Sequence, residues 1–567
     1  MKKVDYKPFL FFSIYTIILV FPSVGCFNLF DWDEINFAES SREMIVSNNF
    51  FQVMINFEPF HEKPPFYFWL QVISMKIFGV SSFSARLPNA VLCIIFPVIL
   101  FNIGSRLKNK TFGWIWSLIF IGGLLPNLYF RTGIIDPYFN LFIFISIYFF
   151  LQSVSTSKIK NVFLSGLFSG LAILTKGPVG LLIVLLSCSI YSFSEREKIS
   201  WKKIFIFIFT VIIVSSPWYM IELINKGPWF LIEFIKYQIE LFSKPVAGHQ
   251  QPVFYHFVVV LFGCVPFSLF ALSNIFKDSK SDLRFEKMMR ICFWTVLILF
   301  SIVSTKIVHY SSMAYVPLSF LGSIEIYKII KGKRFSKRIK LFLFLLSSFI
   351  STILSLFIYL LIYQKDIIMI ISDDIQLRTL LNLNLLWQGW EWAIPLIIVF
   401  ASLLWFIKFK FHPLKYLAIY SILIGLSFSL ISYFIIPKIE FAIQGTAVAF
   451  YEDISKEKKY LTTVGFKSYA PYFYSEVDDL NKVDKLYQKK SDILKKYFSS
   501  SSLNDLNRLQ KNKFNGHVLS WLIHGDVDRT VYFVSKKSKP ILLLQNAKNL
   551  ELIKDQAGYQ FYKRELK

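Results

Sequence analysis

The sequence predicts a polytopic α-helical membrane protein that carries a small α/β domain at its carboxy-terminal end. Hydrophobic residues make up 54% of the 567 residues and charged residues only 17%, below the roughly 25% of soluble domains. The apolar residues also form long runs separated by short basic stretches, and a membrane-spanning helix needs about 20 mostly apolar residues. The net charge of +25 fits basic loops on one side of a membrane better than a nucleic-acid-binding surface.

Hydropathy along the chain predicts about thirteen transmembrane helices. They are expected at residues 9–29, 88–105, 112–129, 135–153, 162–174, 177–193, 204–222, 254–276, 290–304, 310–328, 341–363, 392–407 and 414–436. With this number of helices, the basic stretches alternate onto one face, which the positive-inside rule places in the cytoplasm. These stretches are Lys2/Lys3, Arg106–Lys110, Lys158/Lys160, Arg196–Lys203, Lys277–Arg290, Lys331–Lys340 and Lys408–Lys415. The N-terminus is therefore predicted to be cytoplasmic, with an uncleaved first helix.

The chain then divides into a transmembrane domain, residues 1–436, and a carboxy-terminal domain, residues 437–567. The second part has no further apolar span and is rich in Lys, Asp and Ser. Strands are expected at 459–466 and 529–535, and a helix at 479–497. Because the last span returns the chain to the outer face, this α/β domain is predicted to lie outside the membrane.

The outer loop 31–87 carries the most unusual charges. It contains Asp31-Trp32-Asp33-Glu34 and, about thirty residues later, Glu62-Lys63-Pro64-Pro65. Charge is costly next to a membrane and often marks a functional site, so this loop is predicted to hold a catalytic site. The bland alternative is that Asp33 and its neighbours only cap a helix.

Two stretches of the same loop show apolar residues at helical spacing. Residues 34–44 and 65–78 are therefore predicted to be amphipathic helices lying in the membrane interface. The alternative is that both helices simply pack against the membrane spans.

Several motifs in this part of the chain resemble those of the ArnT-like glycosyltransferases of family 39, which also includes the protein O-mannosyltransferases. They occur in family order across residues 30–320. They are Asp33-Glu34 with Arg42-Glu43-Met44, Glu62-Lys63-Pro64-Pro65, Phe78-Gly79, Ala85-Arg86-Leu87-Pro88, Arg131 with Asp136, Leu174-Thr175-Lys176-Gly177-Pro178, Gly248-His249 with Pro252 and Tyr255, and Lys306 with His309-Tyr310 and Pro317.

The resemblance implies the GT-C fold and a polyprenyl-phosphate-linked sugar as donor. In the ArnT branch it implies transfer of 4-amino-4-deoxy-L-arabinose from undecaprenyl phosphate to lipid A, or a related envelope glycan, on the periplasmic side of the bacterial inner membrane. At three places this sequence differs from the residues that are commonest in the family: Phe37, Phe66 and Lys306-Ile307-Val308-His309. These departures leave the sugar and the acceptor open.

The expected reaction is displacement at the anomeric carbon of the sugar. The leaving phosphate gains charge in the transition state, so nearby cations accelerate the reaction. Lys63, Arg131 and Lys306 are the main candidates, with Arg86 and Lys176 as further ones that could equally be snorkelling anchors.

Carboxylates are expected on the acceptor side of the reaction. Asp33 is predicted to act as the general base or to orient the acceptor, with Asp136 as second candidate. For an amino sugar, these carboxylates could instead bind the ammonium group. The resemblance adds Glu34, His309 and Tyr310 as substrate-binding residues.

Glu62 and His249 are a candidate pair of metal ligands, because some ArnT relatives bind a metal through matching residues. Two ligands make a poor zinc site, since zinc usually takes three or four protein groups. Any divalent metal here is expected to be structural, and no other cofactor is predicted.

Two other functions remain as alternatives. A family 39 enzyme that glycosylates a protein or glycan hydroxyl would need Asp33 as a true base. A transporter of lipid-linked sugars would be expected to carry charges at mid-span in both halves and inverted repeats. The charges cluster on one face instead, and the chain has no evident repeat, which favours an enzyme.

Overall fold

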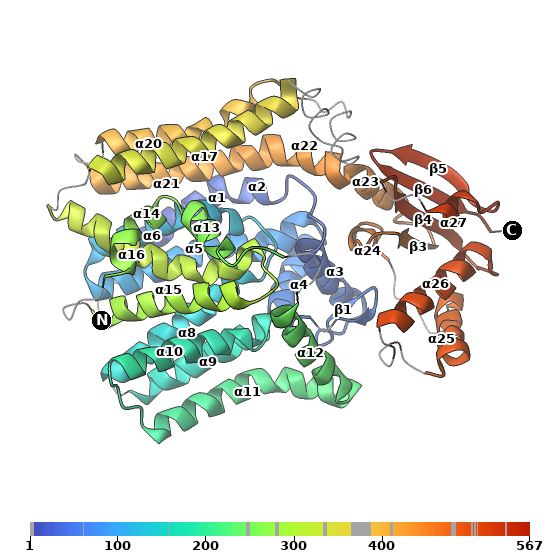
Figure 1. Cartoon of the computed structure of the whole chain (residues 1–567), viewed down its shortest axis with the longest axis horizontal. Helices are drawn as coiled ribbons and strands as arrows, with labels where there is room; N and C mark the ends of the chain where they lie inside the picture. The colour runs from blue at the N-terminus through green and yellow to red at the C-terminus, as the bar shows by residue number, and fades with distance from the viewer. Residues whose placement is uncertain are drawn as a thin grey trace.

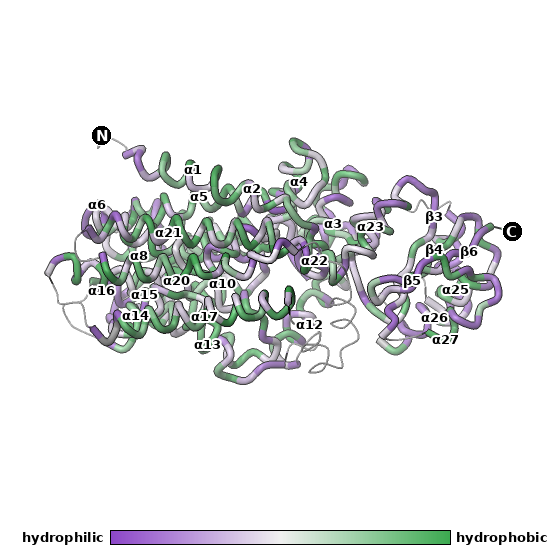
Figure 2. The backbone as a smooth tube through the Cα atoms, turned by 90° about the horizontal axis from the view of Figure 1, so that it is seen from above, coloured by the Kyte–Doolittle hydropathy of each residue, from purple (hydrophilic) through white to green (hydrophobic). Residues whose placement is uncertain are grey.

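The computed structural model shows a helical bundle joined at one end to a mixed β-sheet (Figure 1). The described residues are 5–60, 62–156, 158–244, 250–277, 283–332, 337–363, 387–408, 412–477, 484–500, 503, 506, 508–538 and 541–566. The first described residues lie at the end of the bundle opposite the sheet (Figure 1). Hydrophobic residues dominate the bundle, whereas hydrophilic stretches are frequent around the sheet (Figure 2).

The outer loop folds into two helices and a hairpin. It follows α1 (Lys7–Leu19) and α2 (Phe21–Val24) and contains α3 (Asp33–Val46), β1 (Met54–Ile55), β2 (Glu58–Pro59) and α4 (Phe66–Phe78). The hairpin turn places both Asn56 and Phe57 at positive φ, and the Glu43 carboxylate of α3 accepts hydrogen bonds from both of their N–H groups. This contact fixes the hairpin against α3.

The bundle contains long helices and several interrupted ones. In chain order they are α5 (Ser82–Leu107), α6 (Lys110–Ile121), α7 (Leu124–Tyr129), α8 (Asp136–Thr156), α9 (Ile159–Lys176), α10 (Val179–Ser194), α11 (Trp201–Lys226), α12 (Trp229–Ser243), α13 (Tyr255–Gly263), α14 (Phe267–Ile275), α15 (Arg284–Ile302), η2 (Val308–Ala314), α16 (Tyr315–Ile330), α17 (Lys337–Tyr363), η3 (Glu391–Ala393), α20 (Leu396–Lys408) and α21 (Pro413–Leu430). Their apolar faces meet in one core, where the Trp116 and Phe285 rings both pack against Phe320, with centroids 4.9 Å apart in each pair.

Among the described residues, eight helices are long and apolar enough to cross a membrane by themselves. All thirteen predicted spans fall on helical segments, but some of these are short or interrupted, as at Gly122-Gly123 between α6 and α7. The structure thus confirms a helical multi-span protein, while the number thirteen stays a prediction.

The last helix of the bundle continues past the predicted domain boundary at residue 436. From α21 it runs through η4 (Ile431–Ile435), α22 (Ile436–Glu440) and η5 (Phe441–Gly445) to α23 (Thr446–Asp453). Two of these segments are π-helical. The helix therefore forms the physical link between the bundle and the sheet (Figure 1).

The carboxy-terminal part contains a four-stranded sheet with strand order β3-β4-β6-β5. Its elements are β3 (Lys459–Val464), α24 (Ala470–Tyr474), α25 (Lys485–Phe498), α26 (Arg508–His524), β4 (Thr530–Lys536), α27 (Leu542–Gln545), β5 (Glu551–Gln556) and β6 (Tyr559–Arg564). β3 pairs with β4 in parallel, and the other two pairs are antiparallel. The predicted strands and part of the predicted helix are found, and the first residues of that helix, 479–483, lie outside the described residues.

Alternation along β4 explains how the sheet packs. Val531 and Phe533 lie in the core formed with α25–α27, whereas Tyr532 and Val534 join Phe450 of α23 and Phe473 of α24 on the other face. Successive strand residues point to opposite faces, so both faces of the sheet are covered.

Of the two alternatives for residues 34–44, the structure supports a helix packed within the protein and not one lying in the membrane interface. All of residues 34–44 are buried, because α3 packs between α4 and the layer formed by α23 and α24. Its carboxylates thus lie where the bundle meets the carboxy-terminal part, and not on a free membrane surface.

Candidate active site

The structure brings together a group of charged residues from four separate elements. His309 Nε2 lies 3.6 Å from Asp33 Oδ2 and 3.9 Å from Asp136 Oδ2. The Lys176 ammonium donates to Asp136 Oδ1 at 2.6 Å. These four residues form a chain in which the two carboxylates alternate with the His309 imidazole and the Lys176 ammonium.

Local sequence explains why each side chain reaches this place. Asp33 and Asp136 are the first residues of α3 and α8, where a carboxylate interacts favourably with the helix dipole. Lys176 is the last residue of α9, and Gly177 ends that helix with φ +86°, a conformation that glycine adopts at little cost. His309 lies on η2, the short 3-10 segment that leads into α16.

The two carboxylates differ strongly in exposure. The Asp33 side chain is 43% exposed, whereas that of Asp136 is only 3% exposed. Asp136 is neutralised by Lys176, as a buried carboxylate must be. Asp33 is therefore the carboxylate that an incoming group can reach.

Lys63 lies beside this group in a partly buried position. Its Nζ is 5.5 Å from the centroid of the Tyr237 ring, and the Tyr237 hydroxyl donates to Glu62 Oε2 at 2.9 Å. Burial and the positive charge of Lys176 lower the pKa of Lys63, while Glu62, Asp33 and Asp136 oppose this shift. Lys63 thus belongs to the same electrostatic cluster as the two aspartates.

Tyr310 contributes an aromatic wall to the site. The Lys176 Nζ lies 4.8 Å from the centroid of its ring and 5.5 Å from that of Phe139. Cations are attracted to aromatic faces at such distances, so Lys176 is held both by Asp136 and by these rings.

Glu34 and Arg86 form a separate, buried ion pair. The Arg86 guanidinium donates to both Glu34 oxygens, at 3.0 and 2.8 Å, and to the carbonyls of Val24, Phe27 and Asn28. Burial alone would raise the pKa of Glu34, but Arg86 and the N–H groups of Gly133 and Phe30 lower it overall. The carboxylate therefore stays ionised at neutral pH, and the stability it contributes is lost only as the pH falls through this lowered pKa.

Arg131 and Lys306 are also engaged with the protein. The Arg131 guanidinium donates to Ser23, to the Leu19 and Gly425 carbonyls, to Asn127 and to Ser429. The Lys306 ammonium donates to the Val303 carbonyl at 2.8 Å and is buried. Substrate contact by Glu34, Arg86, Arg131 and Lys306 stays a prediction, and the geometry shows protein partners for each of them.

Removing Arg86 should therefore destabilise the fold. We expect Arg86→Ala to lower the free energy of unfolding by about 3–5 kcal/mol, because it leaves the Glu34 carboxylate buried without its cation. Thermal unfolding followed by size-exclusion chromatography in detergent measures this. The control is Lys110→Ala, which breaks the exposed pair with Asp5 and should change the stability far less, because exposed ion pairs contribute little. An Arg86→Ala protein as stable as this control but inactive would contradict a structural role.

The structure describes only one of the two predicted metal ligands. Glu62 lies in the site and accepts a hydrogen bond from the Tyr237 hydroxyl, whereas His249 lies outside the described residues. Among the described residues, no group of three or more His, Cys, Asp or Glu side chains is placed to hold a metal ion. The pair stays a prediction, and no step below depends on a metal.

The sequence did not indicate one residue of this site. Tyr237 comes from α12, far from the motifs in the chain, and it reaches Glu62 and Lys63 only through tertiary packing. The one available signal was that Tyr237 lies between two predicted spans, 204–222 and 254–276.

Several known proteins are similar to this chain in sequence. The profile of the family Dolichyl-phosphate-mannose-protein mannosyltransferase matches residues 62–221. Two similar proteins are each named undecaprenyl phosphate-alpha-4-amino-4-deoxy-L-arabinose arabinosyl transferase. The one from Wigglesworthia glossinidia brevipalpis is 28% identical over 60% of this chain. The one from Shewanella sediminis is 25% identical over 54% of this chain. The alignments span 61% and 58% of these relatives' own lengths.

The whole fold resembles a solved structure. The crystal structure of ArnT from Cupriavidus metallidurans bound to undecaprenyl phosphate superposes with a TM-score of 0.75 and 17% identity, covering 99% of this chain and 98% of that one. The apo state of the same protein gives the same TM-score. The chain is therefore a multi-span membrane protein with an ArnT-like GT-C fold, and the resemblance predicted from the motifs is confirmed.

Proposed function

We propose that this protein is a glycosyltransferase that moves a sugar from a polyprenyl-phosphate donor to an envelope acceptor. The observation that carries the proposal is the exposed Asp33 carboxylate beside the buried Asp136–Lys176 pair and Lys63. Such a site offers an anion to the acceptor and cations to the leaving group. The ArnT-like fold and the names of the similar proteins support the same reaction.

In this reaction an acceptor oxygen attacks the anomeric carbon, and the bond between that carbon and the phosphate oxygen breaks. Negative charge then grows on the departing polyprenyl phosphate. Lys63 stabilises this charge more in the transition state than in the ground state, which is what accelerates the step. Lys176 contributes to the same positive field, although Asp136 offsets part of its charge.

The acceptor approaches from the side of Asp33. A phosphate acceptor is already nucleophilic and needs only orientation, whereas a hydroxyl must pass its proton to a base. The exposure of Asp33 suits either role, and therefore also suits the alternative acceptor, a protein or glycan hydroxyl. His309, between the two aspartates, positions Asp33, while Asp136 holds Lys176.

The similar proteins act on undecaprenyl phosphate-linked 4-amino-4-deoxy-L-arabinose according to their names. We propose the same donor here, with lipid A or a related envelope glycan as the acceptor. The carboxylate-rich site is compatible with the ammonium group of this sugar.

We further propose that the protein lies in the bacterial inner membrane with its N-terminus in the cytoplasm. The start of α1 and the sheet lie at opposite ends of the bundle (Figure 1), which supports opposite sides of the membrane for them. The active site and the carboxy-terminal part would then face the periplasm.

Release of undecaprenyl phosphate from a purified donor tests the proposed reaction. The full chain in nanodiscs should convert the undecaprenyl-phosphate sugar to undecaprenyl phosphate when an acceptor is supplied, as followed by mass spectrometry. A chain that binds the donor but never cleaves it, with phosphate or hydroxyl acceptors, would contradict the proposal.

The pH dependence of the reaction should reveal the state of Lys63. Because its pKa lies below the ordinary 10.5, we expect kcat/KM to fall at alkaline pH before an ordinary lysine would lose its proton. Lys63→Arg should shift this fall to higher pH, since guanidinium stays charged. An alkaline limb that is the same in both proteins would contradict a role for the Lys63 charge.

A further inference from the structure

Trp32, the residue before Asp33, has an unusual backbone and an exposed side chain. Its φ is +77°, in a region that bulky residues rarely adopt, and its side chain is 45% exposed. Strained backbone positions tend to persist at functional sites. An aromatic ring held open in this way, directly beside the reactive carboxylate, suggests a contact with substrate.

The carboxy-terminal part of the chain holds this tryptophan in place. Asp31 Oδ1 accepts hydrogen bonds from the backbone N–H of Trp32, at 2.8 Å, and from that of Tyr469, at 2.9 Å. The Trp32 and Tyr469 rings pack edge to face, with their centroids 6.1 Å apart. The Lys467 ammonium lies 5.6 Å from the Trp32 ring and 4.9 Å from the Tyr469 ring.

Tyr469 and Lys467 line a pocket of about 410 Å³, and Trp32 contacts both of these residues without lining the pocket itself. We name it the hairpin pocket, because the β1–β2 hairpin forms one wall and the segment before α24 forms the other. Its lining includes Asn56, Phe60, Phe466, Lys467, Tyr469 and Tyr472. The hydrogen bond from the Tyr469 N–H to Asp31 ties this wall of the pocket to the residues just before Asp33.

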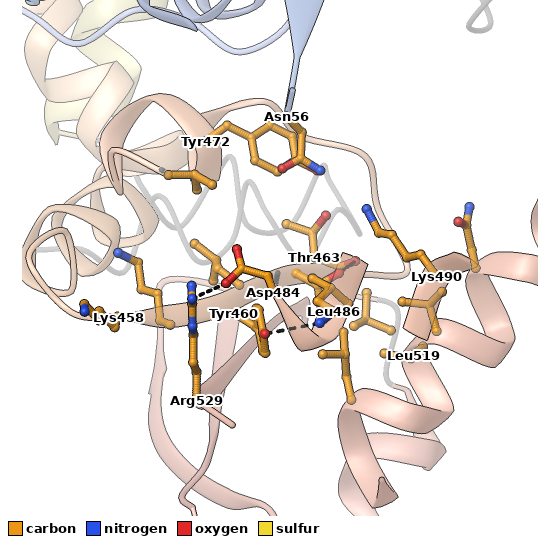
Figure 3. Close-up of a pocket in the computed structure, with 18 of the residues that line it drawn as sticks. Asn56, Lys458, Tyr460, Thr463, Tyr472, Asp484, Leu486, Lys490, Leu519 and Arg529 are labelled. Carbon is orange, nitrogen blue, oxygen red and sulfur yellow. Dashed lines mark hydrogen bonds and ion pairs between the residues drawn. The ribbon is translucent and has the colours of Figure 1, made fainter. Parts of the chain in front are cut away.

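A second, more polar pocket of about 660 Å³ adjoins the hairpin pocket. Asn56, Thr463 and Tyr472 line both pockets. Asn56 and Tyr472 lie side by side at its rim, with Lys490 nearby (Figure 3). The Lys490 Nζ also lies 3.7 Å from the Oε1 atom of Glu58 in the hairpin. The two pockets thus share a wall formed by the hairpin, β3 and α24.

We propose that the hairpin pocket binds the saccharide headgroup of the acceptor, and that Lys467 recognises a negatively charged group on it. Aromatic rings with polar edges suit the alternating apolar and hydroxyl faces of a sugar, and a lysine beside them suits an anion. The mixed polar and aromatic lining favours a sugar over an acyl chain, which would need an apolar wall. This inference rests on the proposed function, and it gives the carboxy-terminal part a role in acceptor binding.

Saturation-transfer NMR tests the inference without turnover. The full chain in nanodiscs is mixed with a water-soluble, deacylated glucosamine disaccharide that carries two phosphates. We expect binding to the native chain and roughly tenfold weaker binding to Trp32→Ala and to Lys467→Ala, as for removal of an anchor residue. Lys467 is exposed, so its variant is expected to fold even if Trp32→Ala does not.

Two controls separate this inference from the proposed function. Lys537→Ala removes an exposed lysine of the same part, paired with Asp555 and outside both pockets, and should bind normally. Lys63→Ala, which acts on the leaving-group side of the site, should bind the disaccharide while losing transfer. No binding by the native chain, or equal binding by the native, Lys467→Ala and Lys537→Ala proteins, would overturn the inference. Selective loss of binding without any transferase activity would support the pocket and contradict the proposed function.

Discussion

Asp33→Asn should lower the rate of sugar transfer by about 10²–10⁴-fold, the usual contribution of a positioned acid or base. The substitution keeps the shape of the side chain but removes the charge that faces the acceptor. Because Asp33 lies on the exposed side of the cluster, next to His309, the fold and donor binding should change little. Initial rates of undecaprenyl phosphate release, measured at saturating donor, give the effect.

The matched control for this variant is Asp453→Asn, which removes an exposed carboxylate at the end of α23. It should transfer at the native rate. If Asp33→Asn kept more than about a tenth of the native rate with both phosphate and hydroxyl acceptors, Asp33 would not be a catalytic residue. A loss restricted to hydroxyl acceptors would identify Asp33 as a general base.

Lys63→Ala should lower the transfer rate by about 10²–10³-fold, as removal of one preorganised donor to a developing anion does elsewhere. Lys63 lies in the same electrostatic cluster as Lys176 and the two aspartates. Without the Lys63 charge, less positive charge would offset the repulsion between the departing phosphate and the Asp33 and Asp136 carboxylates. Single-turnover rates with bound donor separate this effect on chemistry from an effect on donor affinity.

Lys76→Ala is the control from the same outer loop. Lys76 is exposed on α4 and lies over the Phe50 ring at 4.2 Å, so its loss should leave the rate unchanged. Lys63→Arg should retain part of the activity, because it keeps the charge but changes its geometry. A Lys63→Ala protein with a native single-turnover rate would rule out leaving-group stabilisation by this residue.

Features that depend on local sequence could be predicted well. Apolar runs and basic loops located the helices, and the predicted spans 135–153 and 162–174 put Asp136 and Lys176 next to helix ends, where the structure has them. Family order then indicated that these residues share one site. Helix ends and charged turns need no knowledge of distant contacts, which explains the agreement.

Features set by distant contacts could not be predicted. The partner of Arg86 is one example, because its guanidinium binds Glu34, 52 positions earlier in the chain. The spacing of apolar residues in α3 shows one apolar side, but not that α23 and α24 cover the other. The continuation of the last helix to Asp453 was missed because composition changes after residue 436 while the helix does not end there.

Mass spectrometry of lipid A and other envelope glycans tests the central proposal most directly. Cells would express the native chain or Asp33→Asn at equal levels, with the donor pathway present. The proposal predicts an added sugar mass on lipid A or a related glycan in native cells, and its loss in the variant. An added mass that persists with Asp33→Asn, or no added mass on any envelope component while the protein is folded and donor is present, would contradict it and would favour a transporter of lipid-linked sugars.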